Sequence, residues 1–331
     1  MKSVVKAVAE GVLAAVGGLT AVLAVDAALL RGRSARTVCR QLIADGVAVP
    51  VADAEPRAAR VAVFVPGVVA RALPNVTPLL QTLTPLGDVQ LVDYEGERFD
   101  AGEAVQALAG LIAQDLRRYE RVVIWGESMG GMLAAHALDV LRLPMEQRAR
   151  LTVVLSDSPA GESNIVLPIS RITDWFYPGP LLQGFGNGLF GLVHLAGKAF
   201  GYYPGPVHWS WSAVHTPTKY IDPVLDAREV QVAQQEACAG FKLALFADQT
   251  RFIRGGLPPL DALVGVRVVY LMNWPELDIP VRQPLGRDEW VAAAARAGAQ
   301  IESIDVAFPS RHCDYYGWRH HWNALAAEIL Q

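Results

Sequence analysis

The sequence predicts an α/β fold with a mostly parallel central sheet flanked by helices, and a largely helical cap inserted before the last two strands. Two observations lead to this prediction. From residue 37 onward, short continuous apolar runs alternate with longer segments of helical periodicity, the pattern of a parallel sheet covered on both faces. Residues 159–262 interrupt that alternation and are rich in Gly, Pro and aromatic residues, as expected for an inserted cap.

Six apolar runs are the predicted strands. The first, VAVFV at 61–65, is mostly β-branched and stops at Pro66-Gly67, where a strand buried on both faces is expected to end. The third, RVVIW at 121–125, runs directly into a glycine-flanked serine. In chain order the predicted strands are 61–65, 88–94, 121–125, 151–156, 266–272 and 301–308.

Four segments have the periodicity of helices that cover such a sheet. Ala104, Leu108 and Leu111 recur at helical spacing in the first segment. The second segment stops before Pro144, which cannot continue a helix. The predicted helices are 101–118, 129–143, 289–297 and 321–330.

The chain therefore divides into four predicted parts. An N-terminal apolar segment with its linker occupies residues 1–36, and the first part of the core occupies 37–158. The cap follows at 159–262, and the second part of the core is 263–331.

Residues 7–30 are apolar apart from Glu10 and Asp26, and Lys2 and Lys6 precede them. Asp26 shortens the uncharged run below the roughly 20 residues that a spanning helix needs, whereas the whole stretch is long enough. We expect a membrane anchor or a cleaved secretion signal, which would make the protein membrane-associated or secreted. The alternative is a buried Ala-rich helix of the fold in a cytoplasmic protein.

Composition excludes several classes of function. A hydrophobic content of 52% is too high for a disordered chain. The net charge of −4 and the lack of a basic cluster give no reason to expect nucleic-acid binding. The three cysteines show no CxxC spacing, so neither a disulfide framework nor a zinc site is predicted. Nothing in the composition indicates an oligomeric state.

The stretch VVIWGESMGGM at 122–132 places Ser128 between Gly126 and Gly130, where a predicted strand meets a predicted helix. A nucleophile elbow needs this context, because its sharp turn exposes the hydroxyl and the glycines relieve crowding. The helix N-terminus then faces developing negative charge. The alternative is an ordinary turn in which Ser128 caps the helix.

Residues 126–131, Gly-Glu-Ser-Met-Gly-Gly, resemble the nucleophile elbow of the α/β-hydrolase superfamily, which includes esterases, lipases and thioesterases. The resemblance covers roughly residues 45–331 apart from the cap. It implies a catalytic triad in the chain order Ser, acid, His, with the acid usually after the strand that follows the cap.

A serine hydroxyl is a weak nucleophile and needs an adjacent base. His312 follows the last predicted strand, in the loop where the superfamily carries its base. His320 and His321 begin the closing helix and are the alternatives.

The base in turn needs an orienting carboxylate. Asp278, in LDIPV, resembles the acid loop of the superfamily, and Glu276 is the next candidate. Asp157, directly after the fourth predicted strand, occupies a known alternative acid position.

Acyl transfer also needs donors for the oxyanion. The resemblance assigns the backbone N–H of Met129, directly after the nucleophile, and that of Val68, after the first predicted strand. Pro66 departs from the family pattern, which has a histidine at that place. The departure removes a side chain and leaves the backbone donor.

Taken together, the sequence predicts a serine hydrolase that cleaves a small-molecule or lipid carboxylic ester and uses no metal or organic cofactor. An apolar acyl chain is favoured, because the predicted cap contains 14 of the 27 aromatic residues. A thioesterase or an acyltransferase would use the same triad. A non-catalytic binding protein with this fold is a further alternative.

Overall fold

The computed structural model describes most of the core and parts of the insertion. The described residues are 36–43, 47–68, 72–95, 98–165, 221–226, 228–230, 243–274, 281–310, 312 and 314–330. The apolar segment 7–30 and most of the predicted cap lie outside these ranges. No helix within them combines the length and the apolar character needed to cross a membrane.

An eight-stranded sheet in the order β2-β1-β4-β3-β5-β6-β7-β8 forms the centre of the fold. From β4 to β8 along this order, neighbouring strands are parallel, whereas β1 is antiparallel to both β4 and β2. The strands are β1 Arg36–Leu42, β2 Ala48–Pro50, β3 Arg60–Val65, β4 Asp88–Glu95, β5 Arg121–Glu127, β6 Leu151–Ser156, β7 Arg267–Met272 and β8 Ile301–Asp305. The prediction of a mostly parallel sheet flanked by helices is confirmed.

The central strands read as continuous apolar runs because they are buried on both faces. In β3, Val63 packs into one hydrophobic cluster and Phe64 into a second on the opposite face. Both side chains are at most 1% exposed. Alternate side chains therefore fill two separate cores, and each must be apolar.

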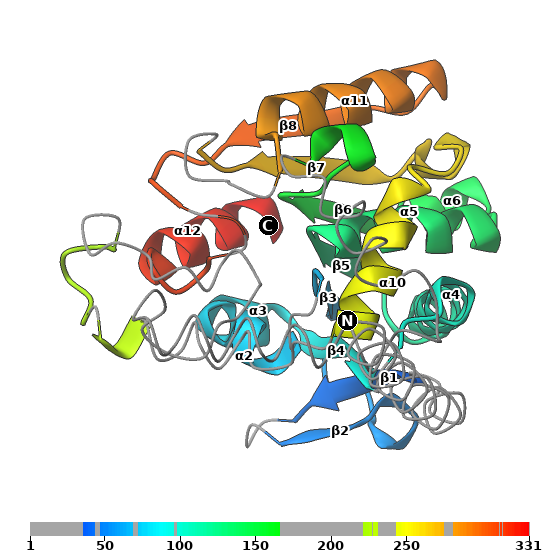
Figure 1. The fold of residues 1–331 in the computed structure, drawn as a ribbon. Coiled ribbons are helices and arrows are strands. Elements are labelled where there is room, and N and C mark those ends of the chain that lie inside the picture. Colours follow the sequence, from blue (N-terminus) through cyan, green and yellow to red (C-terminus); the bar gives the residue numbers. More distant parts are fainter. Residues whose placement is uncertain are drawn as a thin grey trace, which may run out of the picture.

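Helices cover both faces of the sheet, as Figure 1 shows, with α2, α3 and α12 on one side and α4, α5 and α10 on the other. Trp290 of α11 belongs to the same hydrophobic cluster as α4 and α5. The α-helices are α2 Ala72–Val76, α3 Leu80–Leu86, α4 Ala101–Arg118, α5 Met129–Leu141, α6 Met145–Arg148, α10 Leu243–Arg254, α11 Gln283–Arg296 and α12 Arg319–Leu330. Short 3-10 turns are η1 Val51–Asp53, η2 Thr77–Leu79, η3 Glu162–Asn164 and η7 Asp261–Leu263.

The described end of the insertion is fastened to the core through α10. Asp248 of α10 is largely buried and accepts hydrogen bonds from Arg98 Nε at 2.6 Å and Nη2 at 3.0 Å. The backbone N–H of Phe99 donates to the same carboxylate at 3.2 Å. The loop between β4 and α4 therefore holds α10 against α4 and α5.

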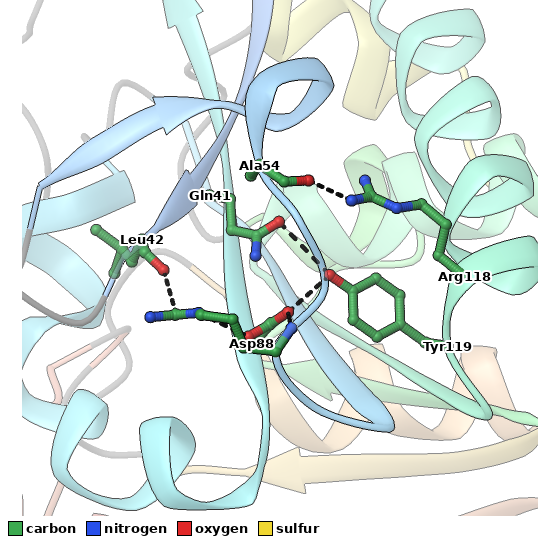
Figure 2. Close-up of polar contacts among 7 residues, drawn as sticks. Gln41, Leu42, Ala54, Asp88, Arg118 and Tyr119 are labelled. Atoms are coloured by element: carbon green, nitrogen blue, oxygen red, sulfur yellow. Dashed lines mark hydrogen bonds and ion pairs between the residues drawn. The ribbon is translucent and has the colours of Figure 1, made fainter.

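A buried polar cluster lies at the amino ends of the parallel strands, away from the end of β5 that precedes Ser128. Figure 2 shows Tyr119 donating to Asp88 Oδ2, at 2.9 Å, with Gln41 alongside. Arg57 pairs with the same carboxylate, with 3.3 Å between Nε and Oδ1. Asp88 stands at the first position of β4, so this cluster marks the amino edge of the parallel strands.

Candidate functional site

Ser128 stands between the carboxyl end of β5 and the first turn of α5, in a strained backbone conformation. Its φ of 50° and ψ of −120° are unusual for a residue with a side chain. Its N–H donates to Ser156 O at 2.7 Å, and its carbonyl accepts from Ser158 Oγ at 2.7 Å. These two bonds to the end of β6 hold the strained turn in place.

The glycines around Ser128 are required by close packing. A Cβ on Gly126 would lie 2.5 Å from Gly131 Cα, and one on Gly130 would lie 2.1 Å from Val65 O. A Cβ on Gly131 would meet Ser158 Oγ at 1.9 Å. Real Cβ atoms do not approach so closely, so the start of α5 packs directly against β3 and the end of β6.

The alternative interpretation, in which Ser128 is an ordinary capping serine, finds no support in this geometry. Ser128 is the N-cap residue of α5, yet its side chain makes no capping hydrogen bond. An N-cap residue also normally has extended backbone, whereas Ser128 has positive φ. The turn therefore has the shape of a nucleophile elbow.

The loop after β3, residues 66–68, approaches this serine directly. A Cβ on Gly67 would lie 2.9 Å from Ser128 Cβ and 3.6 Å from Ser128 Oγ, so only glycine permits the contact. Tyr94 donates to the Pro66 carbonyl at 3.4 Å. Burial raises the pKa of Tyr94 far above its ordinary value, which keeps its hydroxyl protonated as a donor. Val68, the sequence-predicted oxyanion donor, follows at the edge of the apolar core.

Met129, the other sequence-predicted donor, is the first residue of α5, and it is fully buried. The first N–H groups of a helix have no partner within the helix, and they carry the positive end of its dipole. The start of α5 can therefore stabilise negative charge that develops beside Ser128. The side chain of Met129 itself packs into the hydrophobic core.

His312 lies in the loop between β8 and α12, residues 306–318, which we call the histidine loop, and it is partly buried. Tyr315 of this loop accepts a hydrogen bond from Trp125 Nε1 of β5 at 3.1 Å. Asp314 accepts from the N–H groups of Tyr316 and Gly317, each at 3.1 Å. The histidine loop is thus anchored both internally and to the strand that carries Ser128.

Of the three acid candidates, Asp278 and Glu276 lie outside the described residues. Asp157 is fully buried at the end of β6 and has a φ of 54°. Asn273 Nδ2 donates to its Oδ2 at 2.6 Å, and Gln283 Nε2 donates to its Oδ1 at 3.1 Å.

Asn273 and Gln283 stand on either side of residues 275–280, the stretch that contains Asp278. Asp157 thereby joins the residue directly after β7 to the first residue of α11. Sequence reasoning considered Asp157 as an acid and did not foresee this role, because the partners are more than a hundred residues away along the chain.

The alternative histidines at the start of α12 have other contacts. His320 is exposed. His321 Nδ1 lies 3.5 Å from Asp222 Oδ2, and its ring contacts Phe308 and Trp318. The contact with Asp222 joins α12 to a described segment of the insertion.

Within the described residues, no three His, Cys, Asp or Glu side chains gather closely enough to hold a metal ion. Sequence reasoning assigned no role to the polar residues Asn75, Tyr94, Glu127 and Ser158, which hydrogen-bond in and around the elbow and the 66–68 loop. Asn75, Tyr94 and Ser158 are distant from the elbow along the chain, so no local motif includes them. Glu127 lies inside the motif, but the motif does not show its contact with Asn75.

The comparisons with known proteins identify the fold and do not identify the reaction. No known family model matches the sequence, and no curated protein is similar to it in sequence. An esterase from Exiguobacterium antarcticum shares the fold with a TM-score of 0.54 at 13% identity, over 90% of this chain and 99% of that one. A thermophilic esterase from Thermogutta terrifontis gives a TM-score of 0.52 at 14% identity, over 90% and 97%.

A third structure with the same fold concerns recognition and ring-cleavage of the Pseudomonas quinolone signal. It has a TM-score of 0.52 at 16% identity, over 90% of this chain and 98% of that chain. The chain therefore has the α/β-hydrolase fold. Since one fold supports several reactions, the reaction must be argued from the site.

Proposed function

We propose that this protein is a serine hydrolase that cleaves a carboxylic ester through an acyl-enzyme. The observation that carries the proposal is the placement of Ser128. Its backbone is held at positive φ at the carboxyl edge of the sheet, and the 66–68 loop packs against its side chain. Strained residues at such an edge are typical of catalytic positions.

In the proposed first step, Ser128 Oγ attacks the acyl carbon of the ester while His312 takes the hydroxyl proton. The N–H groups of Met129 and Val68 bind the oxyanion of the tetrahedral intermediate. That intermediate collapses when the alcohol leaves with the proton from His312, and Asp278 orients the imidazole throughout.

In the second step, His312 removes a proton from water, and the resulting hydroxide attacks the acyl-enzyme carbonyl. The carboxylic acid leaves as Ser128 regains its proton from His312. These steps use no metal and no organic cofactor. An apolar acyl chain is favoured by the aromatic content of residues 159–262.

Labelling with a fluorophosphonate tests the nucleophile directly, because the reagent reacts only with an activated serine. The full-length protein should label, and Ser128→Ala should not. Ser303→Ala is the matched control, since this serine is exposed on β8 and should label as the original protein does. Labelling that persists in Ser128→Ala would overturn the assignment.

A substrate panel then identifies the reaction. We expect hydrolysis of p-nitrophenyl esters, with a higher kcat/KM for medium and long acyl chains than for acetate. Faster turnover of acyl thioesters would identify a thioesterase, and product formation only with an added alcohol acceptor would identify an acyltransferase. No turnover and no labelling would leave a non-catalytic binding protein.

We further propose that residues 7–30 attach the protein to a membrane or direct its export. The length of the apolar stretch and the lysines that precede it support this. Flotation of the full-length protein with lipid vesicles, together with mass determination of its N-terminus after expression, tests both forms. An intact N-terminus on a protein that does not float would contradict them.

A further inference from the structure

The short helix α2 contacts strand β4, the nucleophile elbow and the histidine loop. It follows the 66–68 loop in the chain, and its first N–H, that of Ala72, donates to Asp93 Oδ1 at 3.0 Å. Asp93 belongs to β4, so the start of α2 is fixed to the sheet.

The second contact joins α2 to the nucleophile elbow. Asn75 Nδ2 donates a hydrogen bond to Glu127 Oε2. Glu127 is the residue directly before Ser128, and the two partners are 5% and 1% exposed. Hydrogen bonds to a buried carboxylate are stronger than those between neutral groups, and a buried carboxylate that loses its donor carries a large penalty.

The third contact joins α2 to the histidine loop. The Tyr316 hydroxyl donates a hydrogen bond to the Pro74 carbonyl of α2. Tyr316 stands four residues after His312. One five-residue helix therefore contacts both the residue before the nucleophile and the loop of the predicted base, and in the chain it follows the 66–68 loop.

These contacts matter because oxyanion donors act only within narrow geometric limits. Catalytic groups must be held within about 0.5 Å of the productive geometry, and a displacement of about 1 Å can cost roughly 100-fold in rate. The 66–68 loop packs against Ser128 itself. The Asn75–Glu127 bond is the side-chain contact that ties the helix after this loop to the elbow.

We propose that Asn75, through Glu127, is a positioning residue that holds the 66–68 loop at the correct distance from Ser128. This inference rests on the proposed function, since it assigns a role within the same acyl transfer. Asn75 does not touch the substrate in this scheme. Its effect should therefore appear in kcat and leave KM nearly unchanged.

Three variants test the proposal with a p-nitrophenyl ester as substrate. Asn75→Ala should lower kcat by about 10- to 100-fold while KM stays within about twofold. Glu127→Gln keeps an acceptor oxygen for Asn75 and should retain kcat within about threefold. The double variant Asn75→Asp/Glu127→Gln reverses donor and acceptor, and it should recover most of the activity that Asn75→Asp alone loses.

Asn323→Ala is the matched control for general destabilisation. Asn323 of α12 donates from Nδ2 to Pro78 O at 2.8 Å, so the variant removes an amide contact on the same side of the sheet. It should lower the Tm without lowering kcat. An equal fall of kcat in this control would overturn the positioning role.

The outcomes separate this inference from the proposed function. A full-length protein that neither labels nor turns over removes the proposed function, and the positioning role with it. An active protein whose folded Asn75→Ala variant keeps its kcat overturns the inference alone. Should Asn75→Ala fail to fold, the double variant decides. A folded double variant whose kcat is as low as that of Asn75→Asp would refute the inference, and one that recovers kcat would support it.

Discussion

Replacing Asp115 by asparagine should change how the stability of the protein depends on pH. Asp115 lies near the end of α4, is completely buried and accepts a hydrogen bond from Gln90 Nε2 at 3.0 Å. Burial raises the pKa of this carboxyl to about 7, with a smaller contribution from Asp88. The Gln90 hydrogen bond and the charge of Arg118 oppose the rise.

The sign and size of the effect follow from proton linkage. The carboxyl titrates near 3.8 in the unfolded chain and near 7 in the folded protein, so between these values the folded state binds more protons. The free energy of unfolding therefore falls as pH rises from about 4 to about 7. At about 1.4 kcal/mol per pH unit, the whole decline is on the order of 4 kcal/mol. Roughly 3 kcal/mol of it falls between about pH 5 and pH 8.

Asparagine resembles the protonated acid, keeps an acceptor for Gln90 and does not titrate. The free energy of unfolding can be measured in urea across this pH range. From low to high pH, its value for Asp115→Asn should rise by about 3 kcal/mol relative to its value for the original protein. Groups that titrate in both proteins cancel in the difference. Glu103→Gln, an exposed carboxylate of the same helix, should give a nearly constant difference. A constant difference for Asp115→Asn as well would refute the reasoning.

Two further substitutions test packing and buried hydrogen bonds, both measured by urea unfolding. Gly130→Ala should destabilise by about 3 kcal/mol or more, because the new Cβ would lie 2.1 Å from a carbonyl oxygen of β3. Gly110→Ala, in an open part of α4, should instead stabilise by up to about 1 kcal/mol, and a comparable loss at both sites would contradict the packing argument. Tyr119→Phe removes the donor to Asp88 and should cost about 1–3 kcal/mol; an unchanged unfolding midpoint would show that the carboxylate does not need it.

The parallel part of the sheet was predictable, whereas its antiparallel edge was not. All six predicted strands exist. The central strands β3, β5, β6 and β7 are almost wholly buried and therefore apolar, whereas β8, at the edge of the sheet, is largely exposed. The strand β1, with the sequence RTVCRQL, was missed. Its Gln41 is buried opposite Gln90 of β4, and such a polar pairing leaves no apolar run to detect.

Element ends were less predictable than element types. Helix α11 begins at Gln283, six residues before the predicted 289, through a Pro and a Gly that read as a turn. Proline suits the first turn of a helix, and Gly286 sits close to Tyr270 Oη. Strand β8 ends at Asp305 instead of 308, after which Val306 N still donates to Met272 O.

In the candidate site, features that are contiguous in sequence could be predicted, whereas contacts between residues distant in sequence could not. The elbow around Ser128 was visible because its strand, turn and helix are contiguous in sequence. The bond between Asn75 and Glu127 spans 52 positions, and no local pattern reports such a pair. Asp278 and Glu276, both outside the described residues, remain predictions.

The double attachment made by Asp157 has a consequence for redesign. Asn273 directly follows β7 and Gln283 is the first residue of α11, so one buried side chain joins the end of a core strand to the start of the next helix. A substitution that removes the carboxylate would release both elements at once, and a redesign of this region should therefore leave Asp157 unchanged.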